Sequence, residues 1–351
     1  ARLMAQAGAF RLLTPNDIGG LETTPRAFAE TLEAYAQGDA SAAWCAMIGS
    51  TSAMNAAYLA RETAEEIFGD PNVITGGVFA PMGKAQPVEG GYRISGRWQW
   101  GSGSPNCSWL SGGCVIVEDG DVRRLPNGAP DSRMAIFPRA EAELIDTWHV
   151  AGLKGTGSGD FAVEDLFVPA DRTVSIVTDA PVATGALYAF PPFGILSVGV
   201  ASVAMGAARA ALDAIVDLAS AKRSQGSKKT LAERQTVQRD VAQLTAHWRA
   251  ARAFLFNEID LTWDVAQAEG NIPMERRADL RLACTHMTRT AAEVARGAYD
   301  LGGGAALYLD SELQRRFRDT HAATQHICTA PATYELMGRI LLGLPTDAGM
   351  V

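Results

Sequence analysis

The second half of the chain places the strongest limit on its fold. After Pro191-Pro192, Ala-rich sequence with apolar residues at helical spacing continues almost to the C-terminal end. We expect four long helices, at about residues 193–223, 230–267, 275–303 and 310–343. Long helices joined by short connections are typical of a four-helix bundle, because each helix buries its apolar face against its neighbours.

The N-terminal region also predicts helices. Phe28, Leu32 and Tyr35 follow one another at the spacing of a single helix face. Asp39 precedes a run of small residues and has the character of an N-cap, because its carboxylate can accept hydrogen bonds from free backbone N–H groups. We therefore expect a helical segment up to about Phe68.

The middle of the chain has a different pattern. Short apolar runs at residues 92–95, 114–117, 134–137 and 161–168 are separated by Gly, Pro, Asn and Asp, and residues 89–91 and 119–121 have the composition of hairpin turns. This pattern predicts short antiparallel strands. The predicted fold is α+β, with an N-terminal helical domain at 1–72, a central antiparallel β domain at 73–180 and a C-terminal four-helix bundle at 190–351.

Composition excludes several classes of protein. A formal net charge of −8 argues against nucleic acid as a partner, since binding to phosphates needs a basic surface. Five scattered cysteines without a CxxC pair fit neither a disulfide framework nor a zinc site, and no HxxxH or ExxH pair suggests a metal. The apolar window at 190–214 contains Arg209 and Asp213, and the chain begins without a signal-like segment. We expect a cytoplasmic protein that binds neither metal nor membrane.

One segment, residues 94–104, concentrates residue types suited to chemistry. Trp98 and Trp100 alternate, and small hydroxyl residues such as Ser102 follow. Such a strand can flank a flat aromatic cofactor, with a tryptophan as a wall and a serine as a hydrogen-bonding group. A packed β-core ending in a Ser/Gly turn explains the same residues. The glycine-rich run at 148–160 lacks P-loop spacing, which excludes a Walker-type phosphate site.

Taken together, the domain order and several motifs resemble the acyl-CoA dehydrogenase superfamily. The motifs are the strand at 91–100, the segment Gly-Leu-Lys-Gly-Thr-Gly-Ser at 152–158, Leu-Gly-Gly-Gly at 301–304 and Arg318-Asp319. Within it, the Phe-Ala-Pro turn at 79–81 and the Trp-Gly-Ser-Gly strand end are most similar to the two-component flavin-dependent monooxygenases. That resemblance implies a reduced flavin (FMN or FAD), O2, a separate flavin reductase, a homotetramer, and oxygenation of a small organic substrate, aromatic compounds included.

The resemblance also assigns roles to residues. It implies that Ser102 contacts flavin N5 beside Trp100, and that Lys222 and Arg223 meet the cofactor phosphates. The remaining cofactor-binding residues that it implies are Val78, Phe79 and Ala80 at the isoalloxazine edge, and Gly302 and Gly303 near a neighbouring subunit's cofactor.

The end of the bundle separates the two main branches of the superfamily. Seven residues separate Arg318-Asp319 from Ile327, which stands where the dehydrogenases that this part resembles have a catalytic Glu. His326 lies next to it, about where the similar monooxygenases have a histidine facing the flavin. We expect His326 to tune or shuttle a proton with its near-neutral imidazole, although a structural histidine on this helix is the simpler alternative. His321 cannot share a helix face with it.

Substrate-binding residues are less clear. Ser52, His149 and Ser158 are the candidates that the sequence offers. Aromatic hydroxylases of this branch often have a histidine where Ser52 stands, and an Asp-His pair where this chain has Pro105-Asn106, so these positions do not support a phenol as the substrate.

Two other functions remain open from the sequence. The first is an FAD-dependent acyl-CoA dehydrogenase whose base comes from another helix, with Glu258 or Glu293 as the acid to consider. The second is a non-catalytic scaffold that binds a ligand or partner.

Ile327 provides a test between the first of these and the monooxygenase. Because isoleucine cannot accept a proton, we expect no reduction of bound FAD when a saturated acyl-CoA is added without a reductase. Bleaching of the flavin absorbance in an anaerobic titration would contradict the monooxygenase interpretation.

Overall fold

The computed structural model describes residues 1–223, 226 and 228–346, and the chain packs as two compact units. The β unit comprises residues 1–23, 45–149 and 154–188. The helical unit comprises residues 24–44, 150–153 and those from 189 onward. This grouping differs from the expected boundaries at 1–72, 73–180 and 190–351, because residues 24–44 pack with the C-terminal helices. The expected last residues, 347–351, lie outside the described part of the chain.

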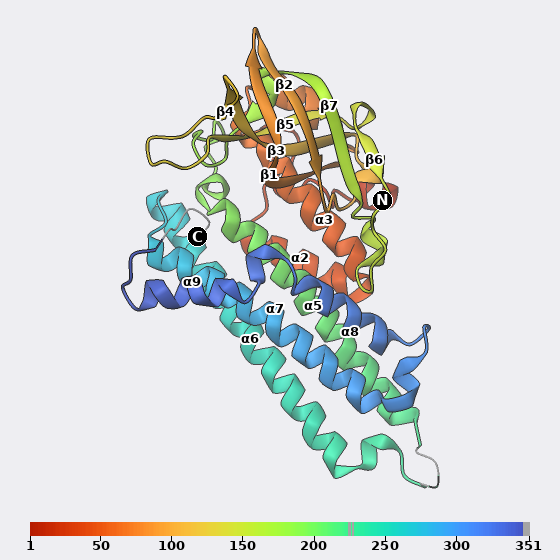
Figure 1. The fold of residues 1–351 in the computed structure, drawn as a ribbon. Helices are drawn as coiled ribbons and strands as arrows, with labels where there is room; N and C mark the ends of the chain where they lie inside the picture. Colours follow the sequence, from red (N-terminus) through yellow and green to blue (C-terminus); the bar gives the residue numbers. More distant parts are fainter. Residues whose placement is uncertain (224–225, 227, 347–351) are drawn as a thin grey trace. The chain divides into compact units, whose positions relative to one another are not determined.

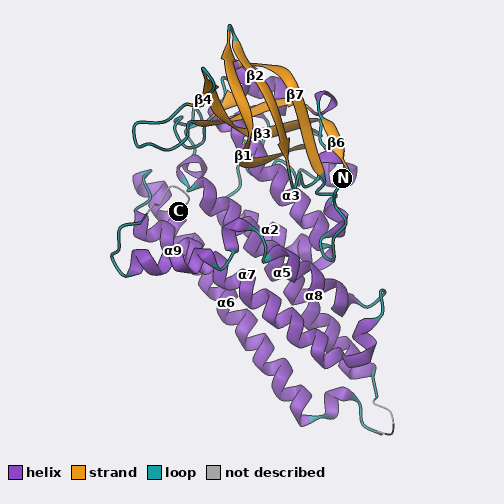
Figure 2. Ribbon diagram, viewed as in Figure 1, coloured by secondary structure: helices purple, strands orange, loops and turns teal. Residues whose placement is uncertain are grey.

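A single eight-stranded sheet forms the centre of the β unit (Figures 1 and 2). Its strand order is β6-β7-β2-β1-β3-β5-β8, with β4 paired to β3. The strands are β1 (Thr75–Val88), β2 (Gly91–Trp98), β3 (Trp109–Glu118), β4 (Asp121–Val122), β5 (Ser132–Pro138), β6 (Glu143–Ile145), β7 (Asp160–Pro169) and β8 (Thr173–Val174). The unit also contains α1 (Arg2–Gln6), α4 (Arg61–Phe68) and most of α3 (Ala40–Ala53).

The sheet is mixed, which corrects the expectation of an antiparallel domain. β1 and β3 run parallel, whereas the other strand pairs are antiparallel. The parallel pair arises because β2 leaves β1 through a tight hairpin and the chain then crosses to the other side of β1. The two expected hairpin turns are confirmed: Gly90 follows β1 with φ 77°, and Asp119 and Gly120 join β3 to β4 with φ 51° and 89°.

Trp98 is the centre of the β-unit core. Its indole is fully buried, stacks on Phe161 at 5.2 Å between ring centroids and donates a hydrogen bond to the carbonyl of Gly113 at 2.8 Å. A Cβ at Gly112 would lie 2.4 Å from this ring, so glycine is needed there for close packing.

Long helices form the helical unit. Its principal helices are α2 (Pro25–Gly38), α5 (Pro192–Ala221), α6 (Gln235–Glu269), α7 (Met274–Gly302), α8 (Glu312–Ala323) and α9 (Ala332–Leu341). Three of the four expected helices are present. The fourth, expected at 310–343, is wrong as one helix: it is divided into α8, the 3-10 turn η10 (Ile327–Thr329) and α9. Pro331 accounts for the second break, before α9, since a proline disfavours helical backbone at the preceding residue and Ala330 is extended.

Helix α5 is the most buried helix of this unit. It is long and apolar enough to cross a membrane, but 83% of its most apolar window is buried inside the protein, as in the core helix of a soluble protein. Small residues let its neighbours approach: a Cβ at Gly206 would lie 2.2 Å from the carbonyl oxygen of Glu33 in α2.

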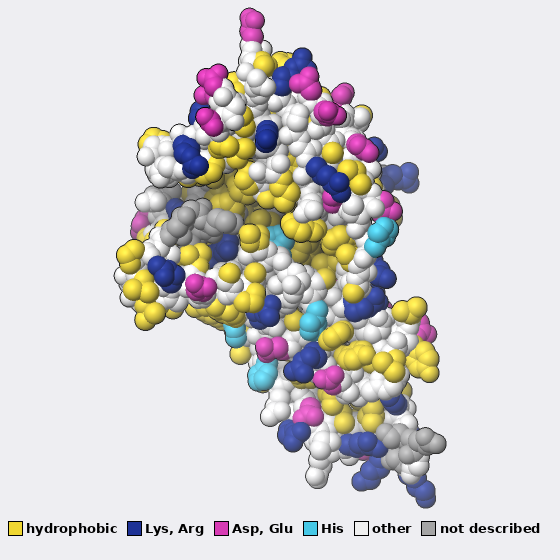
Figure 3. Space-filling model, viewed as in Figure 1, with side chains coloured by type: hydrophobic (Ala, Val, Ile, Leu, Met, Phe, Trp, Pro, Cys, Tyr) yellow, Lys and Arg dark blue, Asp and Glu magenta, His cyan; other side chains and the backbone are white. Residues whose placement is uncertain are grey.

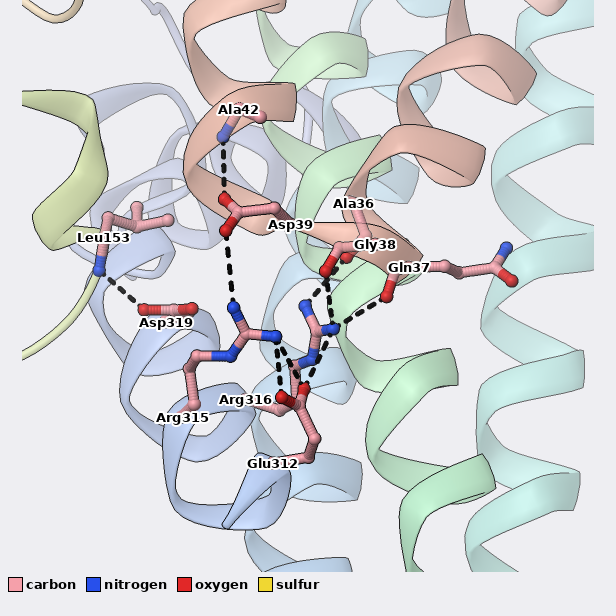
Figure 4. Close-up of polar contacts among 10 residues, drawn as sticks. All are labelled: Ala36, Gln37, Gly38, Asp39, Ala42, Leu153, Glu312, Arg315, Arg316 and Asp319. Atoms are coloured by element: carbon pink, nitrogen blue, oxygen red, sulfur yellow. Dashed lines mark hydrogen bonds and ion pairs between the residues drawn. The ribbon is translucent and has the colours of Figure 1, made fainter. Parts of the chain in front are cut away.

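Arg316 of α8 holds the end of α2 (Figure 4). Its buried guanidinium donates to the carbonyls of Ala36 (3.1 Å), Gln37 (2.7 Å) and Gly38 (2.9 Å), which the helix itself leaves without partners. Asp39 then caps α3, as the sequence predicted, by accepting from the N–H of Ala42 at 2.9 Å. Arg316 therefore fixes the turn between α2 and α3.

Replacing Arg316 tests this role. Arg316→Met removes the donor that pairs three carbonyls at the end of α2, one of them buried, and we expect the free energy of unfolding to fall by about 3 kcal/mol. Arg315→Ala is the matched control, because Arg315 makes partly exposed ion pairs with Glu312 and Asp39 and its loss should cost at most about 1 kcal/mol. Urea denaturation measures both. Equal losses would contradict the proposed role of Arg316.

Candidate functional site

A chain of three buried hydroxyl groups lies in the β unit. The Oγ atoms of Ser102 and Ser158 are 2.7 Å apart, and Ser158 Oγ is 2.6 Å from Thr156 Oγ1 at the end of η5 (Lys154–Thr156). All three side chains are buried. Since each hydroxyl can donate and accept, the direction of the hydrogen bonds along this chain can reverse.

Backbone hydrogen bonds hold the two segments of this hydroxyl chain together. Gly101 N–H donates to the carbonyl of Gly159 at 2.9 Å, and Gly103 N–H donates to the carbonyl of Thr156 at 2.8 Å. Strand β2 ends at Trp98, and Trp100 has φ 63° and an exposed fraction of 61%. The expectation that Trp98 and Trp100 alternate on one strand face is therefore wrong, because the backbone turns between them.

Val78, Phe79 and Ala80 lie in β1 where its pairing with β3 shifts register between Val78 and Gly83. A Cβ at Gly113 would lie 2.1 Å from the carbonyl oxygen of Phe79, so the shift depends on a glycine in β3. Phe79 also borders a small hollow in the β unit, together with Arg133, Met134 and residues 174–177.

In the helical unit, His326 immediately precedes η10 and caps it. Its Nδ1 accepts a hydrogen bond from the backbone N–H of Cys328 at 3.3 Å. The ring proton of the neutral imidazole must therefore be on Nε2. Trp44 meets the ring edge to face, with 5.7 Å between centroids.

The charge state of His326 follows from the same environment. Desolvation, and secondarily the positive charge of Arg281, lower its pKa to about 4. Protonation of Nδ1 is also unfavourable, because the Nδ1–H donor would then face the backbone N–H donor of Cys328. His326 is not on the regular helix that we expected, and its lowered pKa differs from the near-neutral value that we expected for it.

The expected phosphate-contacting residues and glycines lie together in the helical unit. Lys222 Nζ donates to the carbonyl of Gly302 at 2.7 Å, and Arg223 forms a backbone bridge with Thr230. Gly303 has φ 52°, and a Cβ there would meet Lys222 Nζ at 4.0 Å. Ser224 and Gln225, which follow Arg223 in the chain, are outside the described residues.

The other candidate residues have diverse surroundings. Ser52 is half-buried on α3, whereas His149 is exposed and lies 3.9 Å from Asp146. Glu258 forms an ion pair with Arg276 at 2.5 Å, and Glu293 is exposed on α7. Neither acid is a free base in a dry environment. Within the described residues, no three His, Cys, Asp or Glu side chains converge on a position that could hold a metal.

Three residues of these sites were missed from the sequence. Thr156 stands in the Gly-Thr-Gly-Ser run, so its hydroxyl could have been included with Ser158. Trp44 and Arg281 had no such signal, because their contacts with His326 join segments far apart in the chain.

These residues fit a flavin. The N5 atom of a flavin is a donor when reduced and an acceptor when oxidised, and a reversible hydroxyl chain can serve both states. Lys222 uses one of its three N–H donors on Gly302, which leaves two for a phosphate.

Comparison with known proteins gives the family. Residues 198–331 match the family described as acyl-CoA dehydrogenase, C-terminal domain. Indole-3-acetate monooxygenase of Pseudomonas putida is 36% identical over 341 residues, covering 96% of this chain and 84% of that protein. The crystal structure of 3-HSA hydroxylase from Rhodococcus sp. RHA1 matches with a TM-score of 0.88 and 28% identity over 99% of this chain and 90% of that one. XiaF from Streptomyces sp., solved with FADH2 and glycerol, matches with a TM-score of 0.88 and 25% identity over 98% and 88% of the two chains.

Fold and matches together define an oxidoreductase with the acyl-CoA dehydrogenase fold. Within that superfamily, the chain belongs to the flavin-dependent monooxygenases, which work with reduced flavin.

The low pKa of His326 predicts a pH effect on stability. Between about pH 6.5 and 4 the unfolded chain binds a proton at this ring and the folded chain does not, so the contribution of neutral His326 is complete above 6.5 and is lost as the pH falls towards 4. His326→Asn keeps an N-cap acceptor that does not titrate. We expect the variant to lose less stability than the wild type across this window in urea denaturation. Parallel profiles would contradict a buried neutral imidazole.

Proposed function

We propose that this protein is the oxygenase component of a two-component system and that it hydroxylates a small aromatic substrate with reduced flavin and O2, the flavin coming from a separate reductase. The observation that carries this proposal is the buried hydroxyl chain that includes Ser102, in a protein that is 36% identical to indole-3-acetate monooxygenase of Pseudomonas putida. The bound flavin supplies the activation of oxygen.

Ser102 is proposed to hold flavin N5. With reduced flavin the Ser102 hydroxyl would accept a hydrogen bond from N5–H and donate its own hydrogen bond to Ser158, which in turn donates to Thr156. This arrangement keeps the N5 hydrogen in place. Phe79 and Trp100 are proposed to cover the flavin from water, and Ser52, His149 and Ser158 remain the candidates for substrate contact.

His326 is proposed to act as a donor. Its Nδ1 is occupied by Cys328, so Nε2–H is the atom that can reach a substrate or cofactor oxygen. A neutral ring at pH 7 can stabilise a developing negative charge by this hydrogen bond without first gaining a proton. Lys222 and Arg223 are proposed to bind the flavin phosphates, with Gly302 and Gly303 beside them.

The surroundings of the bundle acids make the dehydrogenase alternative less suitable. Ile327 occupies the base position and is exposed, Glu258 is neutralised by Arg276, and Glu293 is in solvent. The scaffold alternative does not account for the hydroxyl chain or for the monooxygenase relatives.

A homotetramer in the cytoplasm is part of the proposal. Apolar side chains lie on the surface of the helical unit (Figure 3), and those of Leu307, Tyr308 and Leu309, after the 301–304 glycine run, are strongly exposed. Exposed apolar clusters of this kind are typical of subunit interfaces. The five free thiols fit a reducing compartment.

Ser102→Ala tests the proposed flavin contact. Loss of a hydrogen bond of about 1 to 3 kcal/mol should raise the rate of hydrogen peroxide release from protein mixed with reduced flavin and O2 by roughly 5- to 150-fold. Stopped-flow absorbance and a peroxide assay measure this. Ser111→Ala is the control, since Ser111 is similarly buried in the same unit but donates to the carbonyl of Gly76. Wild-type kinetics in Ser102→Ala would place the flavin elsewhere.

A further inference from the structure

Asp160 is a carboxylate buried at the start of β7. Its exposed fraction is 5%, and both of its oxygens accept hydrogen bonds. Oδ2 accepts from Nε of Arg97 at 2.8 Å and from Nη2 of the same guanidinium at 2.7 Å, and Oδ1 accepts from Thr147 Oγ1 at 2.7 Å. Aspartate is uncommon in strands, and burial of a carboxylate is unfavourable unless donors surround it. Its presence here therefore points to a role for these contacts.

The same contacts tie together the ends of three neighbouring strands. Arg97 is near the end of β2, Asp160 begins β7, and Thr147 comes two residues after β6. Thr147 Oγ1 also accepts from the backbone N–H of Asp160 at 3.2 Å, which closes a ring between the two residues. The adjacent backbone is closely packed, because a Cβ at Gly159 would lie 2.6 Å from the carbonyl oxygen of Ile145. Asp160 therefore limits how far the start of β7 can shift against β2 and β6.

The hydroxyl chain begins beside this junction. Ser158 precedes Asp160 by two residues, and the carbonyl of the intervening Gly159 accepts from Gly101 N–H at 2.9 Å. Gly101 directly precedes Ser102, whose Oγ is 2.7 Å from that of Ser158. A hydrogen bond between two hydroxyl groups weakens when the oxygens separate beyond about 3 Å. A small shift of β7 against β2 is therefore enough to break the contact between the two serines.

A second Arg–Asp pair joins the same two strands and shows what Asp160 has in addition. Arg93 of β2 and Asp165 of β7 are 3.5 Å apart, and the Asp165 side chain is 74% exposed. The Asp160 side chain is 6% exposed and has Thr147 as a further partner. Ion pairs in solvent stabilise a protein little, whereas a buried carboxylate that loses its donors is strongly unfavourable. Asp165 therefore provides a matched control for Asp160.

We propose that Asp160 is a positioning residue for the hydroxyl chain. Through its bonds to Arg97 and Thr147, it holds the start of β7 in place. The Oγ of Ser158 then stays within hydrogen-bonding distance of Ser102. The inference rests on the proposed function, since it explains how the chain fixes the serine that is proposed to contact flavin N5. Asp160 acts through the backbone of residues 158–160 and is not itself a catalytic residue.

The first experiment measures hydrogen exchange in the protein without flavin. Asp160→Asn keeps the size of the side chain but removes the negative charge that pairs with Arg97. Because the Gly159 carbonyl then holds Gly101 less firmly, we expect the N–H of Gly101 to exchange with deuterium at least about tenfold faster than in the wild type. Asp165→Asn should leave this exchange unchanged. Exchange at the wild-type rate in a folded Asp160→Asn protein would overturn the proposal.

Thr147→Val covers the case in which Asp160→Asn does not fold. Valine has nearly the shape of threonine, but it neither donates to Oδ1 of Asp160 nor accepts from the N–H of that residue. The exchange of Gly101 N–H should again be faster, here by roughly three- to tenfold. Exchange at the wild-type rate would overturn the proposal, because the junction would then not control the position of Gly101.

Peroxide release separates this inference from the proposed function. With reduced flavin and O2, Asp160→Asn should release peroxide faster than the wild type. The double variant with Ser102→Ala should release it no faster than Ser102→Ala alone, because the contact is already lost. Effects that multiply would indicate an independent structural defect and overturn the positioning role. Faster exchange of Gly101 with wild-type peroxide release in both single variants would support the positioning role and contradict the flavin contact of Ser102.

Discussion

Close packing around α5 is the constraint on which the helical unit depends. The helix is lined with Gly, Ala and Ser, and α2, α7 and η10 all pack against it. A single added methyl at Gly206 would collide with the backbone of α2. Because the helices approach so closely, a long side chain such as Arg281 can enter this interior only where a hydrogen-bond acceptor is present, and Arg281 donates to the carbonyl of Phe193.

The interruption between α8 and α9 shows how local sequence can override periodicity. The apolar spacing over 310–343 predicted one helix, but Pro331 cannot continue a helix and moves Ala330 to extended backbone. The break releases the backbone N–H of Cys328 from helical hydrogen bonding, and His326 accepts from it. In an unbroken helix the same histidine would have had no such partner and no fixed tautomer. The chemistry proposed for His326 therefore depends on the break between α8 and η10, where His326 has extended backbone.

Much of the fold was predictable because it depends on short-range patterns. The hairpins at Gly90 and Gly120, the Asp39 cap and three of the four long helices follow from turn chemistry, capping and periodicity. The parallel pairing of β1 with β3 and the transfer of α2 to the helical unit depend on long-range packing, which no local pattern encodes. Ser102 and Ser158 were identified from composition and family resemblance, but their 2.7 Å contact needed coordinates. Arg281 was missed because a lone arginine in a helix gives no sign of burial.

Both candidate sites use neutral groups where charged ones would be simpler. In the β unit the polar chain consists of hydroxyls, and in the helical unit the imidazole is held uncharged beside a cation. A fixed charge in a dry site strongly favours one ionisation state of a bound group and opposes its change to the other. Hydroxyl groups and a neutral imidazole can stabilise the bound group in either state through a hydrogen bond. An oxygenase that must accept reduced flavin and release oxidised flavin meets both states in every cycle. Neutral groups that can form a hydrogen bond in both states suit that requirement.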